Sequence, residues 1–493
     1  MADTAIGRGY ATDGATGRHG GASTTSTTAD VVALAAVTVV SVRTGSVVVG
    51  LVAAALVGVA VRRPSLALLA VMLSVAGMMR SEQAWASLAP DHLGPFTGQA
   101  AVVAEAKPYG DASRIVLEVE GERFEVWARG RAAGLRVATW RGGDRVDVSG
   151  VRVALDDERA RRVAWEHVVG ELEVDWLGDR APGVPLHRAS NRVRVLVEDG
   201  AGHLPAADGP LLRGLVIGDD RDQPPEMVER FRASGLAHLT AVSGQNVAFV
   251  LAAAGPLLGR ARPFGRWLLT VGLIGWFVVI TRFEPSILRA GTMAALSATA
   301  FVLGHERAPA RLLALAVTGL VLIDPLLVWS IGFWLSVGAT AGVTVVGPWL
   351  GRQLSRFGWM AMPVAITLGA QLGVALPSML VFGRLPLVGT VANLLAVPVA
   401  GLVMLYGLPA CLLAGAVPAI GPVVMFPLRA GVRWIDTVAA VGAELEPQPP
   451  WTWLGWMAVA LIVVAVCRRS GATRLGGVPQ PASAPPARPV PRR

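Results

Sequence analysis

Apolar stretches of membrane-spanning length fill most of the second half of the chain. Residues 326–350 and 387–428 contain no charged side chain, and about 20 apolar residues suffice to cross a bilayer core of about 30 Å. Within a core at residues 243–468, the pattern predicts spans near 244–259, 267–281, 287–304, 312–323, 326–349, 359–381, 388–415 and 451–467, with a short further segment at 416–428. Apolar runs within residues 30–80 add two or three helices. The pattern therefore predicts a polytopic α-helical membrane protein with about 10–12 spans.

A different pattern occupies residues 94–180, where polar and apolar residues tend to alternate with period two. Ile115 and Leu117 fall on one face of such a segment, whereas Arg114 and Glu118 fall on the other. Five or six short strands in about 85 residues predict a small antiparallel β-barrel, for which an OB-like fold is the leading candidate. A fragment of a generic β-sandwich is the alternative.

Residues 185–242 predict amphipathic helices that do not cross the membrane. Pro225 and Glu226 are typical of a helix start, because proline fits the first turn and the helix dipole stabilises an acidic side chain there. The two ends of the chain, residues 1–29 and 469–493, lack apolar periodicity and predict disordered segments.

The composition also indicates a membrane protein. Hydrophobic residues make up 53% of the chain and charged residues 16%, with a mean hydropathy of +0.53. That leaves too little charge to cover a soluble surface. The net charge is +9, but residues 81–200 hold 20 acidic and 16 basic side chains, so overall charge is weak evidence for a nucleic-acid partner. Cys411 and Cys467 lie in apolar segments, and neither a disulfide framework nor a metal site is predicted from them.

The basic residues predict an orientation in the lipid bilayer. Arginines cluster in the C-terminal tail and in short loops at residues 62–63, 260–266, 305–311 and 352–356. Positively charged loops stay on the cytoplasmic side, and alternating spans place all of these loops there if segment 416–428 also crosses. We therefore expect a multi-pass protein of the cytoplasmic membrane, with residues 80–240 outside and the C-terminus in the cytoplasm.

Three clusters combine Gly and Pro with polar side chains where predicted spans begin. The first cluster runs through residues 214–222 (GLVIGDDRD) and 235–246 (GLAHLTAVSGQN). The second is residues 284–290 (EPSILRA), and the third is an Asp-Pro pair at 324–325 followed by residues 332–336 (GFWLS). Polar and charged groups at such places cost free energy unless they are partnered, so they mark candidate functional sites.

In this order and spacing, the three clusters resemble the competence domain of the ComEC family, the inner-membrane DNA-uptake channel of transformable bacteria. The matching residues are Gly218, Asp219, His238, Leu239, Ala241, Ser243, Gly244, Pro285, Ser286, Arg289, Ala290, Asp324, Pro325, Gly332, Phe333, Leu335 and Ser336. Residues 393–398 resemble a further family element, and the predicted barrel matches the family's OB-like domain in position and size. The resemblance covers about residues 30–465. It implies a channel that passes single-stranded DNA inward in natural transformation.

Two features depart from the family's pattern. Asn246 stands where the family signature usually has a second histidine. Many members also carry a C-terminal metallo-β-lactamase-like nuclease domain, whereas this chain ends about 25 residues after its last predicted span and contains no His-x-His-x-Asp-His run. A P-loop is absent as well. We therefore expect a protein that is not an enzyme, needs no metal or cofactor, and works with a separate nuclease and a cytoplasmic ATPase or DNA-binding protein. A homo-oligomer is compatible with the sequence.

The candidates for the translocation path are Asp219, His238, Ser243, Asn246, Arg289, Asp324, Gln371 and Asn393. Arg289 gives the strongest signal, because a charged side chain one turn into an apolar helix costs at least about 2.5–3.5 kcal/mol unless it is paired. Snorkelling of its side chain to the outer surface is the alternative.

The other candidates have simpler alternative roles. His238 fits a structural, hydrogen-bonded histidine, and Asp219 fits a solvated turn. Ser243 is explained more simply as a helix N-cap than as a nucleophile. Gln371 and Asn393 fit hydrogen bonds between neighbouring helices as well as a pore lining.

Six residues of the predicted barrel are candidates for contact with DNA: Trp127, Arg129, Arg131, Arg136, Trp140 and Arg141. They combine stacking surfaces with guanidinium groups, as single-stranded DNA binders do, although the acidic neighbours Glu122 and Glu125 dilute the charge. Two other functions stay open at this point. One is transport of another polymer or solute, because a fold does not fix its cargo. The other is an intramembrane hydrolase using His238 and the aspartates, which no ligand spacing supports.

Overall fold

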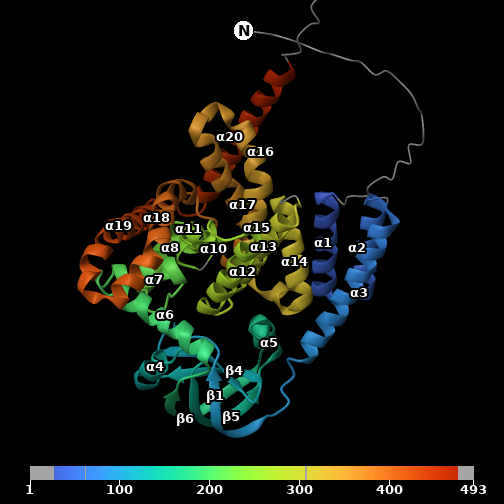
Figure 1. Ribbon diagram of the computed structural model, residues 1–493. Helices are drawn as coiled ribbons and strands as arrows, with labels where there is room; N and C mark the ends of the chain where they lie inside the picture. The colour runs from blue at the N-terminus through green and yellow to red at the C-terminus, as the bar shows by residue number, and fades with distance from the viewer. Residues whose placement is uncertain (1–26, 62, 242, 306–307, 476–493) are drawn as a thin grey trace, which may run out of the picture.

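The computed structural model describes residues 27–61, 63–241, 243–305 and 308–475. Over these ranges the chain forms a mostly helical body with one small β-sheet module at its lower end (Figure 1). Most of the two chain ends that the sequence predicts to be disordered lie outside the described residues.

Three helices precede the sheet: α1 (Thr28–Thr44), α2 (Val47–Val61) and α3 (Pro64–Ala86). Small polar side chains link them, since the Ser41 hydroxyl lies 3.0 Å from Ser74 Oγ and Ser74 donates to the Gly50 carbonyl at 3.1 Å. Such contacts hold apolar helices together where water is absent. α3 then leads the chain down to the sheet module (Figure 1).

The sheet module closes on itself. Its elements are β1 (Gly94–Val102), β2 (Lys107–Tyr109), β3 (Ala112–Val119), β4 (Glu122–Arg129), β5 (Arg145–Ala154) and β6 (Val168–Ala181), with the short helices α4 (Arg131–Ala138) and α5 (Asp157–Val163). The strands are hydrogen-bonded in the order β1-β5-β6-β4-β3-β2, and β1 also pairs with β3, so all strands except β2 form a ring. Neighbours run antiparallel except β4 and β6, which are parallel.

Apolar side chains fill this ring, which we call the barrel. Ile115 and Leu117, predicted to share one face, are 1% and 0% exposed. Phe124 and Trp140 pack in the same cluster. The barrel therefore has its own hydrophobic core, separate from the cores of the helical body.

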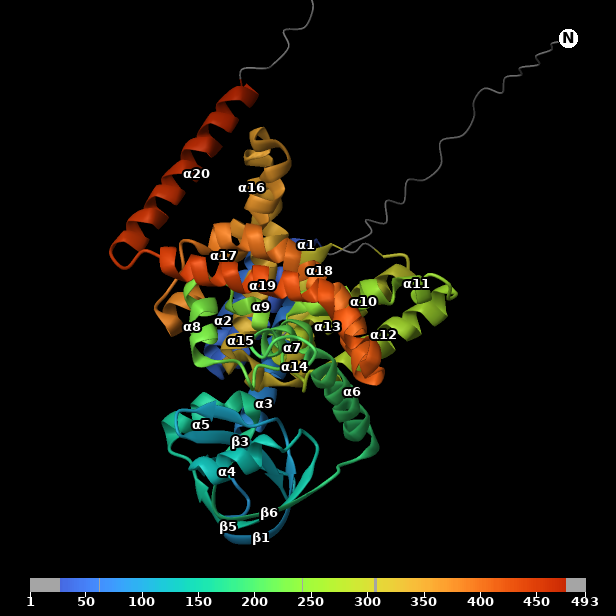
Figure 2. The same cartoon turned by 90° about the vertical axis from the view of Figure 1, so that its left-hand side faces the viewer.

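Four helices lead from the barrel into the helical body: α6 (Pro185–Ala201), α7 (Asp208–Ile217), α8 (Pro225–Ala233) and α9 (Ala237–Thr240). They bury apolar side chains against α18 (Gly389–Ala416) and α19 (Gly421–Leu445), which run side by side across the body (Figure 2). α6 approaches α18 so closely that a Cβ on Gly200 would lie 2.2 Å from the Cys411 carbonyl oxygen. This packing fixes the direction of α6, which carries several of the charged groups described below.

The remaining helices are α10 (Gly244–Ala253), α11 (Gly255–Leu258), α12 (Pro263–Ile280), α13 (Pro285–Val302), α14 (Pro309–Ile323), α15 (Ile331–Ala341), α16 (Gly347–Gln353), α17 (Ala361–Phe382) and α20 (Trp451–Leu475). Among the described residues, five helical stretches are long and apolar enough to cross a membrane: Pro64–Ala86, Pro263–Ile280, Ile331–Gln353, Ser355–Phe382 and Gly389–Ala416.

These long apolar helices are fewer than the 10–12 predicted spans. The span predicted at 244–259 is divided at Gly255 into the short helices α10 and α11. Segment 416–428 forms no span of its own, because most of it belongs to α19, an amphipathic helix that also carries Arg433 and Asp436. The predicted orientation assumed a separate crossing at this segment, and it stays a prediction.

Facing glycines bring α15 and α17 into close contact. A Cβ on Gly342 would lie 2.0 Å from the Gly369 carbonyl oxygen, and a Cβ on Gly373 would lie 2.0 Å from that of Gly338. Directly after α15 the backbone widens into a π-helical turn, Gly342–Val346. Small residues allow helices in membranes to approach at backbone distance, so these positions tolerate no side chain without a shift of one helix.

We expect Gly342→Ala to lower the thermal unfolding midpoint of the purified protein in detergent. The added methyl group must push α17 away, and such overpacking costs about 1–3 kcal/mol. The matched control is Gly319→Ala on α14, where nothing lies within 4 Å of the new Cβ and the midpoint should stay equal or rise slightly. Equal midpoints for the two variants would contradict the close approach of α15 and α17.

Candidate functional site

Arg289 lies where three helices meet inside the helical body. It is in the second turn of α13 and is only 5% exposed. Its Nε donates to Ser336 Oγ on α15 at 2.8 Å, and its Nη1 lies 3.1 Å from Met293 Sδ. The third helix is α10, where a Cβ on Gly244 would lie 3.1 Å from Arg289 Nη2. We call Gly244, Arg289, Met293 and Ser336 the Arg289 centre.

The start of α10 is held in place by its own capping groups. Ser243 is the N-cap, and its hydroxyl accepts from the Gln245 backbone N–H. Asn246 Oδ1 accepts from the Ser243 backbone N–H at 3.1 Å, and its Nδ2 donates to the Leu215 carbonyl at 2.7 Å. Asn246 is 2% exposed and ties α10 to α7. These two residues therefore position the backbone beside Arg289, and their side chains are hydrogen-bonded within the described chain.

The Arg289 centre favours an anion. Within the described parts of the chain, Arg289 forms no ion pair, and its polar partners are a hydroxyl and a thioether. The N-terminus of α10 adds the partial positive charge of a helix dipole at the same point. A guanidinium group buried among apolar helices is expensive without a negative partner, so this arrangement is suited to a negatively charged group that arrives from outside the chain.

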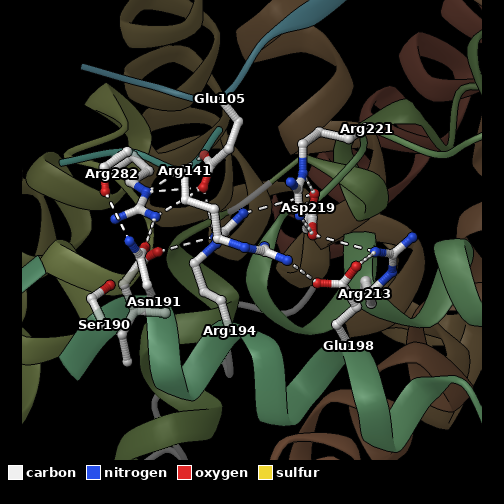
Figure 3. A network of polar contacts seen from close by, with 12 residues as sticks. Glu105, Arg141, Ser190, Asn191, Arg194, Glu198, Arg213, Asp219, Arg221 and Arg282 are labelled. Atoms are coloured by element: carbon white, nitrogen blue, oxygen red, sulfur yellow. Dashed lines mark hydrogen bonds and ion pairs between the residues drawn. The ribbon is translucent and has the colours of Figure 1, made fainter. Parts of the chain in front are cut away.

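A second group of polar side chains lies between the barrel and the helical body. We call it the junction network. Its members are Glu105, Arg141, Asn191, Arg194, Glu198, Arg213, Asp219, Arg221 and Arg282, which Figure 3 labels, together with Asp222, which pairs with Arg213. Glu105 and Arg141 come from the barrel, three members come from α6, and the others come from α7, the loop after α7 and the turn after α12.

Asp219 is the centre of one half of the junction network. Its side chain is 2% exposed and receives two hydrogen bonds of 2.7 Å from Arg221. Arg194 and Arg213 each place a nitrogen 3.7 Å away. Burial alone would raise the pKa of Asp219, but the hydrogen bonds from Arg221 and the charges of the three arginines hold it well below its usual range. Asp219 is therefore a fixed counter-ion and not a solvated turn.

Glu105 connects the barrel to the helical body. Its carboxylate accepts from Arg282 Nη2 at 2.8 Å and lies 3.4 Å from Arg194 Nε. Burial alone would raise the pKa of Glu105, but the charges of Arg194 and Arg282 have the larger effect and lower it to about 2. Arg282 and Phe283 have φ angles of 59° and 58° in the turn before α13, a left-handed backbone that non-glycine residues rarely adopt. The contact with Glu105 helps to hold this strained turn.

Asp324 and His238 lie apart from the Arg289 centre. Asp324 caps the turn Pro325–Trp329 and places its Oδ2 3.0 Å from Nε2 of His167 in the barrel. It is therefore a second contact between the barrel and the helical body. His238 on α9 is solvent-exposed, and its Nδ1 lies 3.2 Å from the Gly235 carbonyl oxygen.

Gln371 and Asn393 make contacts within or between neighbouring helices. Thr390 on α18 donates to Gln371 Oε1 on α17 at 2.7 Å. Asn393 Nδ2 donates to the Gly389 carbonyl of its own helix at 2.7 Å. Neither residue joins the Arg289 centre in this structure.

The six DNA-contact candidates of the barrel are split between different surroundings. Trp140 is 1% exposed and packs in the barrel core, so it has no free ring face for a base. Trp127 packs edge-on against Tyr109 with ring centroids 5.6 Å apart. Arg129 and Arg131 are exposed, and Arg136, also exposed, donates to the Leu177 carbonyl. Arg141 belongs to the junction network.

Sequence reasoning missed Glu105, Arg194, Arg213 and Arg282. Arg213 gave a usable signal, because it is a single charge between apolar residues in the run LLRGLV, the same reason that identified Arg289. Glu105, Arg194 and Arg282 have charged neighbours in the sequence, so the sequence alone does not distinguish them from exposed charged residues. In the part of the chain that the structure describes, no group of three or more His, Cys, Asp or Glu residues is arranged to hold a metal ion.

Comparison with known proteins decides the family. A family model described as "Competence protein" matches residues 215–471, which is 257 of the 493 residues. The chain belongs to the competence protein family. This confirms the resemblance to the ComEC family, and the matched region contains the Arg289 centre together with Asp219, Arg221 and Arg282. Family membership and several apolar helices together indicate a multi-pass membrane protein.

Three curated relatives are similar to parts of the chain. The uncharacterized protein YcaI of Escherichia coli (strain K12) is 28% identical over 52% of this chain and 36% of its own length. Competence protein ComA of Neisseria gonorrhoeae is 31% identical over 38% and 28%, and ComE operon protein 3 of Bacillus subtilis (strain 168) is 24% identical over 54% and 35%. The chain thus spans about a third of the length of these relatives. No solved structure matches it.

The pKa of Glu105 predicts how docking of the barrel depends on pH. Because the docked value of about 2 lies below the ordinary 4.5, the contribution of Glu105 is complete above about pH 4.5 and is lost as the pH falls toward 2. Energy transfer between one dye on the barrel and one on the helical body should fall over that range. In the Glu105→Gln variant, energy transfer should already be low at about pH 7.

The matched control for this measurement is Glu118→Gln. Glu118 lies on the barrel surface with a side chain that is 44% exposed and 3.7 Å from Arg123, where an ion pair contributes little. Energy transfer in this variant should be the same as in the unmodified protein. If energy transfer in Glu105→Gln also equals that of the unmodified protein at neutral pH, Glu105 does not hold the barrel on the helical body.

Proposed function

We propose that this protein is a membrane channel that passes single-stranded DNA inward in natural transformation. Membership of the competence family supports a role in DNA uptake. The proposal of a channel rests on the place where Ser243-Gly244, Arg289 and Ser336 meet, one part of each of the three motif clusters. The guanidinium group at this place is buried, and the described residues provide no carboxylate partner for it. A DNA strand carries one negative charge per nucleotide and would supply that partner repeatedly as it moves.

In this proposal the barrel is an OB-like domain outside the cytoplasm that receives the strand. A five-stranded Greek-key barrel is the OB architecture, and the ring made by all strands except β2, with its parallel β4–β6 pair, is consistent with it. The orientation is supported by the basic loops that hold Arg260, Arg262 and Arg352, since such loops favour the cytoplasmic side.

The proposed channel is not itself an enzyme. The guanidinium, hydroxyl and thioether groups at the Arg289 centre can bind and release an anion, but they include no base or nucleophile pair of the kind hydrolysis needs. A passive path cannot set the direction of transport. A separate nuclease would therefore supply the single strand, and a cytoplasmic ATPase or DNA-binding protein would draw it inward.

Transport of a different polymer or solute is the second candidate. The acidic excess of residues 81–200, with 20 acidic and 16 basic side chains, favours it because a polyanion is repelled by such a surface. The Arg289 centre favours an anionic cargo over a neutral one. DNA is therefore the preferred cargo, and an uptake experiment separates the two functions.

We expect Arg289→Ala to reduce the amount of fluorescent DNA that enters the cell by about tenfold or more, the effect of losing roughly 1.4 kcal/mol. The host is a transformable strain in which this gene replaces its own competence channel gene. Surface-bound DNA and the amount of channel protein in the membrane should be unchanged. Ser336→Ala keeps the charge but removes the hydrogen bond that orients it, so its loss should be smaller.

The matched control is Arg352→Ala, which removes the same charge from an exposed position at the end of α16 and should leave uptake intact. Normal DNA uptake by the Arg289→Ala variant would contradict the assignment of Arg289 to the translocation path. If the unmodified protein restores no DNA uptake at all, the cargo is not DNA.

A further inference from the structure

A cleft of about 520 Å³ opens between the barrel and α6, at the edge of the junction network. Three arginines reach its wall, Arg141 and Arg180 from the barrel and Arg221 from the loop after α7. Glu198 and Asp222 line it too, from α6 and from the same loop. The cleft is therefore bounded on both sides by guanidinium groups, with two carboxylates among them.

The two carboxylates differ from the buried ones of the network in exposure. The side chains of Glu105 and Asp219 are 8% and 2% exposed, whereas those of Glu198 and Asp222 are 36% and 61% exposed. Buried ion pairs are costly to break, but exposed pairs exchange readily because water and other ions compete for them. Glu198 and Asp222 are thus the replaceable partners in the network.

These two carboxylates occupy arginines that face the cleft or lie directly behind it. Glu198 accepts from Arg141 Nη2 with one oxygen and lies 3.6 Å from Arg213 Nη1 with the other. Asp222 Oδ2 accepts from Arg213 Nη2 at 2.5 Å. One carboxylate therefore bridges a barrel arginine to a helical-body arginine, as a phosphate group with several oxygens would do.

The arginines have capacity beyond these partners. Around the cleft and the network behind it, six arginines (Arg141, Arg180, Arg194, Arg213, Arg221 and Arg282) face five carboxylates (Glu105, Asp144, Glu198, Asp219 and Asp222). Arg141 Nη1 is buried and has no hydrogen-bond partner among the described residues. A buried donor without an acceptor is unfavourable, and a ligand with more oxygen atoms than one carboxylate would offer it an acceptor.

We propose that this cleft binds phosphate groups of a single-stranded nucleic acid, and that Glu198 and Asp222 occupy the same arginines while no strand is bound. The inference rests on the proposed function, because it names where the strand meets the outer side of the channel. The volume of the cleft suits about one nucleotide unit. Pro108, Ala138 and Val195 give the cleft an apolar wall for sugar or base, which an inorganic anion would not need.

Binding would also change how the barrel is held. When a phosphate group takes the place of the Glu198 carboxylate, the bridge from Arg141 to Arg213 runs through the strand and not through α6. Glu105 and Asp219 stay in place because they are buried. The strand would thus be held at the joint between the two modules, next to the turn that carries Arg282.

The test measures binding of a fluorescent oligothymidylate of about 16 nucleotides, the upper end of what one OB-type domain covers. The full chain is purified in nanodiscs of phosphatidylcholine, and anisotropy is followed at fixed salt. Glu198→Gln removes the competing charge and keeps the side-chain shape, so affinity should rise by about tenfold. Arg141→Gln should lower it by a similar factor.

Glu118→Gln is the control for the general effect of removing one negative charge from this side of the molecule. It lies outside the cleft and should leave the affinity close to that of the unmodified protein. Unchanged affinity in Glu198→Gln, or an equal gain in Glu118→Gln, would overturn the proposal. The proposal would also be overturned if Glu198→Gln raised the affinity for phosphatidylglycerol without raising the affinity for the oligothymidylate.

Two combinations of results separate the cleft assignment from the channel function. If Glu198→Gln binds like the unmodified protein while Arg289→Ala still loses DNA uptake, the cleft assignment is wrong and the channel function stands. If Glu198→Gln gains affinity but the unmodified protein restores no uptake in cells, the cleft assignment stands and the channel function is wrong.

Discussion

A guanidinium group withdrawn from water needs a negative partner, and this chain meets that need in two different ways. In the junction network, Arg194 and Arg282 find theirs in Glu105 and Asp219, which are themselves buried. At Arg289 the described chain supplies no carboxylate, only a hydroxyl and a sulfur atom. The first arrangement is closed and holds the barrel on the helices. The second leaves the guanidinium group without a negative partner among the described residues, which is the basis for proposing Arg289 as a contact with the cargo.

The three motif clusters connect these two places. The first contains Asp219 of the network and Gly244 of the Arg289 centre. The second directly follows the turn at Arg282, which Glu105 of the barrel contacts, and contains Arg289. The third contains Asp324, which contacts His167 of the barrel, and Ser336.

Local pattern was enough to predict part of this molecule. Alternation identified the barrel core at Ile115 and Leu117, and the cost of burying a charge identified Arg289, because both depend on near neighbours in sequence. The junction network was not predictable in this way. Glu105 is 177 residues from Arg282, and a carboxylate in a loop reads as solvated until a distant arginine is known to face it. The course of α19 was not predictable from hydropathy either, because an apolar segment does not show that it continues into an amphipathic helix.

In the proposed channel, a DNA strand passes the Arg289 centre. A photo-crosslinking amino acid at Met293, beside the guanidinium group, tests it directly when DNA uptake is stalled by a bulky end group. The control position is Leu376 on α17, which is 70% exposed on the outside of the helical body. We expect covalent adducts between DNA and the protein at position 293 and none at position 376. Adducts at neither position, or at both alike, while labelled DNA enters the cell, would contradict it.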